Sequence, residues 1–118
     1  MIPLLVFLGG GTGSLFRYLL SALIPYKSGF PWATFLTNLA ACFVMGYILA
    51  LLDRQVFSHI ANYRFFFLTG FCGGFSTFST FSSETLILIK GGQVLLAGIY
   101  VSVSIIMCIT LVFLGSKF

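Results

Sequence analysis

Charged residues are scarce in this sequence, and their scarcity excludes most classes of soluble protein. The 118 residues include six Lys or Arg and two Asp or Glu, so that 7% are charged, whereas 59% are hydrophobic. A soluble domain carries about a quarter charged residues. Because so few charges cannot cover a water-facing surface, we predict an all-α integral membrane protein.

Metal-ligating and nucleophilic residues are also few. The sequence has one histidine, His59, and three cysteines, Cys42, Cys72 and Cys108. An odd number of cysteines, one in each of three apolar segments, does not suggest a disulfide framework, and we interpret them as small packing residues. No metal-ligand pattern, nucleophile–base arrangement or phosphate loop is visible. The sequence therefore predicts neither an enzyme nor a protein that binds nucleic acid.

Long apolar segments fill nearly all of the chain. The hydrocarbon core of a bilayer takes about 20 apolar helical residues, and four such segments lie at about 3–24, 31–52, 65–89 and 94–115. We predict a single four-helix transmembrane domain over 1–118. The first segment lacks the basic start and cleavage site of a signal peptide, so we expect it to be a span of the mature protein.

The third segment carries residues that a helix facing only lipid does not need. From Gly70 to Glu84 it holds four phenylalanines, six hydroxyl side chains, a carboxylate and the pair Gly73-Gly74. Polar groups at membrane depth are costly and by default indicate function. We predict that the glycine pair breaks the helix, which would free carbonyls for a hard cation such as Na⁺. A kink that serves packing alone is the alternative.

Aromatic rings and hydroxyl groups alternate in this segment. Phe71, Phe75, Phe78 and Phe81 follow at spacings of four, three and three. The edge of an aromatic ring is positive, so rings presented edge-on, together with Ser and Thr O–H donors, would solvate a small anion without trapping it. The alternative is a stripe of rings that packs or faces lipid.

Polar residues in the other segments extend this pattern. Thr34 and Asn38 share a helix face at i, i+4, and an asparagine amide offers two N–H donors. They suit an anion path, or a hydrogen bond between helices. Arg17 could lie at the mouth of such a path. Alternatively, its long side chain could extend to the membrane surface. Glu84 could act as a proton carrier, a cation ligand or an electrostatic anchor. The alternative is that it lies near the end of the helix and faces water.

The fourth segment has one semi-polar stripe. It consists of Tyr100, Ser104 and Cys108, at i, i+4 and i+8. Isolated hydroxyls are common in membrane helices, so the stripe alone does not identify a path.

The positive charges do not favour one orientation in the membrane. Arg54, Arg64 and Lys117 lie on one side of the predicted domain, and Lys27 and Lys90, with Arg17 if it lies near the helix end, lie on the other. Loops on the cytoplasmic side normally carry the Lys/Arg excess. A balance of this kind is expected if copies insert both ways and pair antiparallel, or if other features set one orientation. Four helices are also few to enclose a solute path, so we expect a homo-oligomer.

Three motifs together resemble one family. They are Gly10-Gly11-Thr12-Gly13-Ser14-Leu15-Phe16-Arg17-Tyr18, then Thr34-Phe35-Leu36-Thr37-Asn38, then the whole stretch 70–84. In this order they closely resemble the Fluc (CrcB) fluoride channels, over essentially the whole chain.

The resemblance implies a function and an assembly. It implies a passive fluoride channel that exports fluoride across the cell membrane of a bacterium, built as an antiparallel, dual-topology homodimer with two pores. A central structural Na⁺ would be held by the backbone carbonyls of Gly73 and Ser76. The fluoride pore would be lined by Asn38, Phe78, Phe81, Ser79, Thr80, Glu84, Tyr100, Ser104 and Thr34, with Arg17 in the vestibule.

Two alternatives share the bulk properties of the chain. A small proton-coupled multidrug-type transporter has a similar size and span count, but its essential carboxylate lies in the first span, where this chain has no acid. A non-transporting membrane subunit would use the polar third segment to dock a partner, and the purified protein alone would then show no ion flux.

Overall fold

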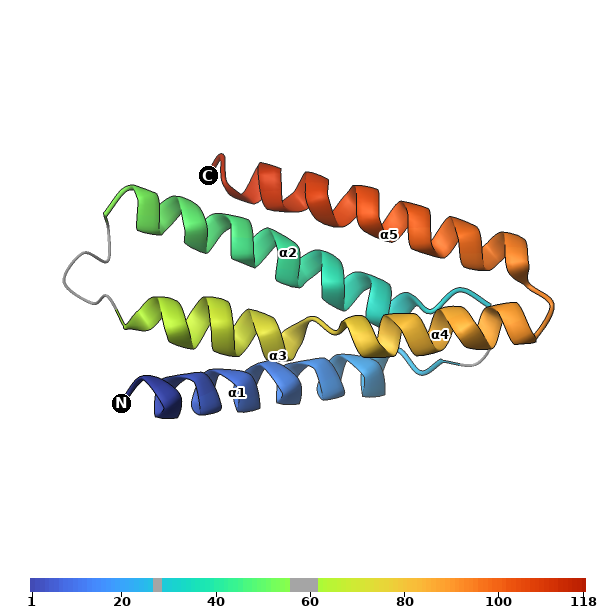
Figure 1. Ribbon diagram of the computed structural model, residues 1–118, viewed down its shortest axis with the longest axis horizontal. Helices are drawn as coiled ribbons and strands as arrows, with labels where there is room; N and C mark the ends of the chain where they lie inside the picture. The colour runs from blue at the N-terminus through green and yellow to red at the C-terminus, as the bar shows by residue number, and fades with distance from the viewer. Residues whose placement is uncertain (27–28, 56–61) are drawn as a thin grey trace.

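Helices make up all the regular structure of residues 1–26, 29–55 and 62–118, which the computed structural model describes. Lys27 and His59 lie outside these ranges. In chain order (Figure 1) the helices are α1 (Ile2–Leu23), α2 (Trp32–Asp53), η1 (Phe65–Cys72), α3 (Gly73–Phe75), α4 (Phe78–Lys90) and α5 (Val94–Gly115).

The helix ends fall within one residue of the four predicted segments. By length and hydropathy, α1, α2 and α5 can each cross a membrane, so the chain is a multi-pass membrane protein. The third predicted segment is divided among η1, α3 and α4. That these three cross the bilayer together, in one four-span domain, stays a prediction.

The break in the third segment lies later than the glycine pair that was expected to cause it. Gly73 has helical backbone angles, φ −65° and ψ −36°. The chain becomes extended at Ser76 and Thr77, with ψ of 152° and 120°. The prediction of a break at Gly73-Gly74 is therefore wrong by about three residues. Before the break, η1 is a π-helix, a form that hydropathy does not reveal.

Glycines bring α1 against η1 and α3 backbone to backbone. A Cβ atom on Gly9 or Gly13 would lie closer than 3.0 Å to the Phe66 or Phe71 carbonyl oxygen, and one on Gly74 would collide with Gly10. Small residues that allow such approach are a common basis of helix packing in membranes. Two of the three glycines of the third segment thus serve packing: Gly70 and Gly74 form half of this contact, and neither interrupts the helix.

A second glycine contact joins α2 to α5, which run side by side in the same direction (Figure 1). A Cβ on Gly46 would meet the Val112 carbonyl, and one on Gly115 would meet that of Phe43, each closer than 3.0 Å. The two helices are therefore in close contact near their C-terminal ends.

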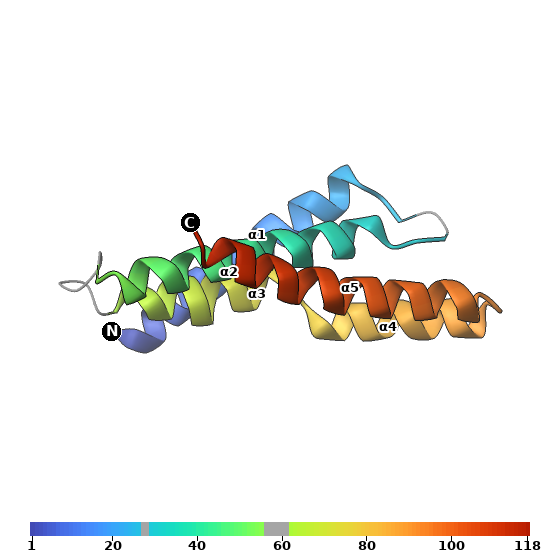
Figure 2. The same cartoon turned by 90° about the horizontal axis from the view of Figure 1, so that it is seen from above.

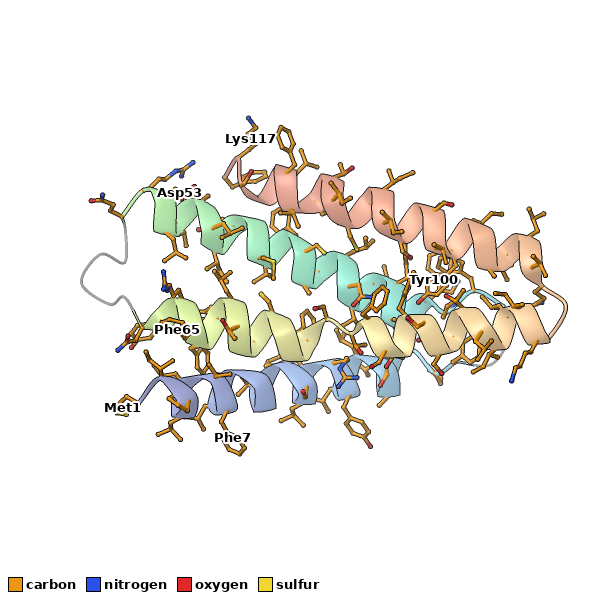
Figure 3. The ribbon with its side chains drawn as sticks, viewed as in Figure 1. Met1, Phe7, Asp53, Phe65, Tyr100 and Lys117 are labelled. Atoms are coloured by element: carbon orange, nitrogen blue, oxygen red, sulfur yellow. The ribbon has the colours of Figure 1, made fainter. Side chains whose placement is uncertain are left out.

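The helix α4 packs against α5 and α2, and its backbone makes no contact with α1. Seen from above, α4 lies along α5 and apart from α1 (Figure 2), and the whole structure measures 52 × 28 × 20 Å. Side chains hold α4 here: Phe81 and Leu88 pack with Phe35, Ala97 and Tyr100 in a buried cluster. Tyr100 lies between α5 and α4 at its centre (Figure 3).

The glycine contact of α1 predicts a position-specific cost. Gly13→Ala should destabilise the protein by about 1–3 kcal/mol, because the added methyl group overpacks a filled contact. Gly11→Ala on the same helix is the control, since its Cβ meets nothing within 4 Å and both substitutions gain the same helix propensity. Thermal unfolding in detergent measures the difference. Equal melting temperatures for the two variants would contradict the close approach.

Candidate functional site

One hydrogen bond between distant parts of the chain holds the break in place. The backbone N–H of Thr77 donates to Oδ1 of Asn38, on α2, at 3.0 Å. An extended residue at membrane depth cannot use a helix partner, and an unpaired N–H in an apolar medium costs several kcal/mol. The Asn38 side chain supplies the missing acceptor. In this way α2 fixes the point at which the third segment leaves helical form.

Thr77 also starts the helix that follows. Its Oγ1 accepts a hydrogen bond from the backbone N–H of Thr80 at 3.4 Å, which is the N-cap arrangement that Ser, Thr, Asp and Asn favour. Sequence reasoning missed Thr77 as a site residue. The available signal was its position: a threonine immediately before an apolar helix start and three residues before a second threonine.

An open hollow of about 240 Å³ lies where the break meets α2 and α5. We call it the α2–α5 groove. No charged side chain lines it among the described residues. Its lining consists of Asn38, Cys42, Ser76, Thr77, Phe78, Phe81, Ser104, Ile105 and Cys108.

Hydrogen-bond donors without partners gather at this groove. Because a backbone N–H can only donate, the Asn38 oxygen must face Thr77, and the amide N–H groups point the other way. Within the described residues, those N–H groups and the buried hydroxyl of Ser104, which also lines the groove, have no hydrogen-bond partner. The hydroxyl of Tyr100, buried behind Phe81, has none either. Buried polar groups are normally satisfied, so a wall of free donors indicates a place for an acceptor that is not part of this chain.

The two phenylalanines of the groove differ sharply in exposure. Phe81 is 8% exposed and packs against Tyr100 at a ring distance of 5.0 Å, whereas Phe78 is 79% exposed. Phe71 and Phe75, before the break, stack on each other at 5.4 Å. The predicted stripe of four rings is thus two separate pairs, because the extended residues turn α4 relative to α3.

A second hollow, of about 190 Å³, lies on the other side of the break. We call it the polar pocket. Arg17 lines it and donates from Nε to the Gly74 carbonyl at 3.2 Å. Arg17 therefore points to the break, and it does not reach away from the protein along its stem. The other lining residues are Tyr18, Ser21, Ala33, Thr34, Thr37, Thr77 and Thr80.

Glu84 faces α2. Its carboxylate accepts a hydrogen bond from the hydroxyl of Thr34, and its side chain is half-buried. The contact ties α4 to the first turn of α2. It also occupies the only O–H of Thr34, which is then not free for an anion.

Several other hydroxyls have likewise used their one proton. Thr37, buried on α2, donates to the Ala33 carbonyl at 2.7 Å, and Ser76 donates to the Cys72 carbonyl at 2.8 Å. By contrast, Thr80 accepts from Thr77 at 3.4 Å and keeps its proton. Ser79, exposed on α4, lies 3.2 Å from the Thr77 hydroxyl.

The predicted site residues are thus divided within one chain. The α2–α5 groove brings together Asn38, Phe78, Phe81 and Ser104, and Tyr100 packs directly behind Phe81. The polar pocket collects Arg17, Thr34 and Thr80. Thr77 borders both, and it is the residue that connects the two sets.

The carbonyls at the break have distinct environments. The Cys72 oxygen accepts from the Ser76 backbone N–H at 3.0 Å, and the Gly74 oxygen accepts from Arg17. For the oxygens of Gly73 and Ser76, no hydrogen bond from outside the helices is recorded in the described chain. A Cβ at Gly73 would meet nothing within 4 Å, so this face of the break is open.

Comparison with known proteins identifies the family. Residues 4–116 match the family described as CrcB-like protein, Camphor Resistance (CrcB). A Pyrococcus abyssi relative is 47% identical over 112 residues, covering 95% of this chain and 90% of its own. A Pyrococcus horikoshii relative is 45% identical over 111 residues (94% and 89%), and a Methanocaldococcus jannaschii relative is 39% identical over 113 (95% and 89%).

All three relatives carry the name fluoride-specific ion channel FluC. They are ion channels and not enzymes. The match spans all the helices that form the break, the α2–α5 groove and the polar pocket. The chain belongs to the CrcB family of ion channels.

Proposed function

We propose that this chain is the subunit of a fluoride-selective passive channel of the cell membrane. The relatives' names supply the ion, and the α2–α5 groove supplies the chemistry. Fluoride is small and strongly hydrated, so a path for it must replace water with hydrogen-bond donors. The free donors of Asn38 and Ser104, which line the groove, are the observation that carries the proposal.

The absence of charge in the groove fits conduction. Among the described residues its lining holds no Lys, Arg, Asp or Glu. A fixed cation there would hold an anion, whereas conduction requires binding that is weak enough to allow exit. The ring edges of Phe78 and Phe81 would add weak positive potential without a full charge.

The partner in this proposal is a second, antiparallel copy, which would give two pores per dimer. The support is the open face of the break: non-helical backbone at membrane depth has to be covered by protein or to line water. Phe78, 79% exposed next to an open groove, would then complete the pore of the other copy. The balanced Lys/Arg count of the sequence is consistent with insertion in both orientations.

A structural Na⁺ at the dimer centre is the second part of this proposal. The backbone carbonyls of Gly73 and Ser76 would hold it, since they are hard oxygen donors with no recorded partner outside the helices. Two copies would together supply four such oxygens. The ion would neutralise the dipoles of the carbonyls that the break leaves unpaired.

Export needs no energy source beyond the membrane potential. A negative cell interior drives an anion outward by about 2.3 kcal/mol per charge per 100 mV. The direct test is efflux from liposomes reconstituted with the purified protein, read with a fluoride electrode, with chloride in parallel. Rapid fluoride release with little chloride release is expected. Folded, incorporated protein that releases neither ion would overturn the proposal and favour the transporter or the non-transporting subunit.

Asn38→Asp should block fluoride efflux and leave the fold intact. A carboxylate oxygen can still accept the Thr77 N–H, but the two amide donors are lost and a negative charge is added. Two unit charges 4 Å apart near a protein surface repel by about 4 kcal/mol, so the rate should fall at least about 100-fold. Asn62→Asp is the control for charge, because Asn62 is exposed and does not line the groove. Undiminished efflux by the Asn38→Asp variant would place Asn38 outside the path.

Phe81→Ile should abolish or sharply reduce efflux through loss of the ring edge. Phe35→Ile is a matched control, because both rings are 8% exposed in the same buried cluster and only Phe81 lines the groove. The two variants should lose similar melting temperature, while efflux is lost only in the first. If efflux instead follows stability in both variants, the ring has no role in conduction.

Replacing Na⁺ with a large organic cation should lower the melting temperature of the purified protein, since a ligand bound only by the native state stabilises it. Ser76→Ala should keep this dependence, because the proposed ligand is a backbone carbonyl. An unchanged melting temperature from Na⁺-free to Na⁺-rich buffer would argue against the ion.

A further inference from the structure

The wall of the α2–α5 groove contains two thiols that the proposed conduction does not use. Cys42 lies on α2 and Cys108 on α5, and both line the groove. Both are half-buried free cysteines, whereas the third cysteine, Cys72, is fully buried. The groove therefore offers a pair of thiols that a small solute can reach.

The fold brings these two thiols together. Cys42 lies one helical turn before Gly46, and Cys108 lies one turn before Val112. Gly46 and Val112 form one of the close contacts between α2 and α5. Because the helices run in the same direction, both cysteines lie about one turn before this contact, on the side where the groove opens. Both thiols line the same groove and lie near each other. One turn earlier again, Asn38 and Ser104 line the same groove.

We infer that Cys42 and Cys108 form a two-sulfur binding site for a soft, thiophilic cation of the Cu⁺ or Ag⁺ class, placed in the wall of the groove. Soft thiolate ligands select such ions. No cluster of three or more His, Cys, Asp or Glu is found among the described residues, which disfavours the four-ligand structural zinc site and leaves a two-coordinate ion.

Binding is an exchange of protons for metal. The two S–H bonds break, two metal–sulfur bonds form, and two protons go to the buffer; no electron is transferred. With a monovalent cation the resulting dithiolate complex has a net charge of −1. An anionic group in the groove would oppose the passage of an anion in the same way as Asn38→Asp, so the bound cation should inhibit flux. This last step rests on the proposed function, whereas the binding does not.

Ser104 places the two thiols beside the proposed anion path. It is 5% exposed, lines the same groove one turn before Cys108, and has no hydrogen-bond partner in the described chain. Cys72, with no groove exposure, gives an internal control within the same chain.

The test uses Ag⁺ as the probe, in nitrate or fluoride buffers that contain no chloride. Native mass spectrometry and competition with a soluble thiol should show one tightly held Ag⁺ per chain in the unmodified protein and in Cys72→Ser. Loss of even an outer-shell partner costs about 10–100-fold in metal affinity, so Cys42→Ser and Cys108→Ser should each weaken binding by at least about 100-fold. Melting temperatures without Ag⁺ establish that each variant folds.

Fluoride efflux from liposomes is the second readout. Micromolar-range Ag⁺ should stop efflux by the unmodified protein and by Cys72→Ser, and a dithiol chelator should restore it. Equal Ag⁺ affinity in all three serine variants, or tight binding that survives Cys42→Ser, would overturn the two-sulfur site. If efflux is absent without Ag⁺, the proposed function fails, and the binding measurement still decides whether the site exists.

Discussion

Every backbone N–H at membrane depth needs an acceptor from within the protein, and the bond from Thr77 to Asn38 meets this need where the third segment leaves helical form. It joins residues 39 positions apart in sequence. The same bond orients the amide N–H groups of Asn38 away from the break, and it lets Thr77 cap α4. The free amide donors of Asn38, the exposed Phe78 and the open carbonyls of Gly73 and Ser76 all lie at this single anchored interruption.

The two hollows beside the break have different chemistry because their donors are used differently. On the Arg17 side, a cation and a carboxylate are both engaged, with the Gly74 carbonyl and with Thr34. On the groove side, no charged residue is among the described lining residues, and the Ser104 hydroxyl lacks a partner. The second side therefore suits the proposed path of a strongly hydrated anion, because free donors line it and no fixed charge would hold the ion.

The sequence predicted the helices well and the break poorly, for different physical reasons. Helix limits depend on local hydropathy and on nearby Pro, Gly and charge, so the ends agree within one residue. The break depends on the Asn38 side chain, which local sequence cannot place. Glycine pairs are ambiguous as well: Gly74 looks like a helix breaker, but its missing Cβ is needed for the contact with Gly10. Thr77 was not predicted as a site residue, because its role depends on its hydrogen bonds to both Asn38 and Thr80.

The two ends of the molecule are held together by different kinds of contact. The contact of α1 with η1 and α3 is made by backbone atoms, which have no alternative rotamers, so it permits one geometry only. The other end depends on side chains: the Phe81 and Tyr100 rings, and the hydrogen bond between Thr34 and Glu84. Side chains can exchange conformations without breaking the fold. The chain therefore combines a stiff half that fixes the position of the break with a more compliant α4 half, and the groove lies where the two meet.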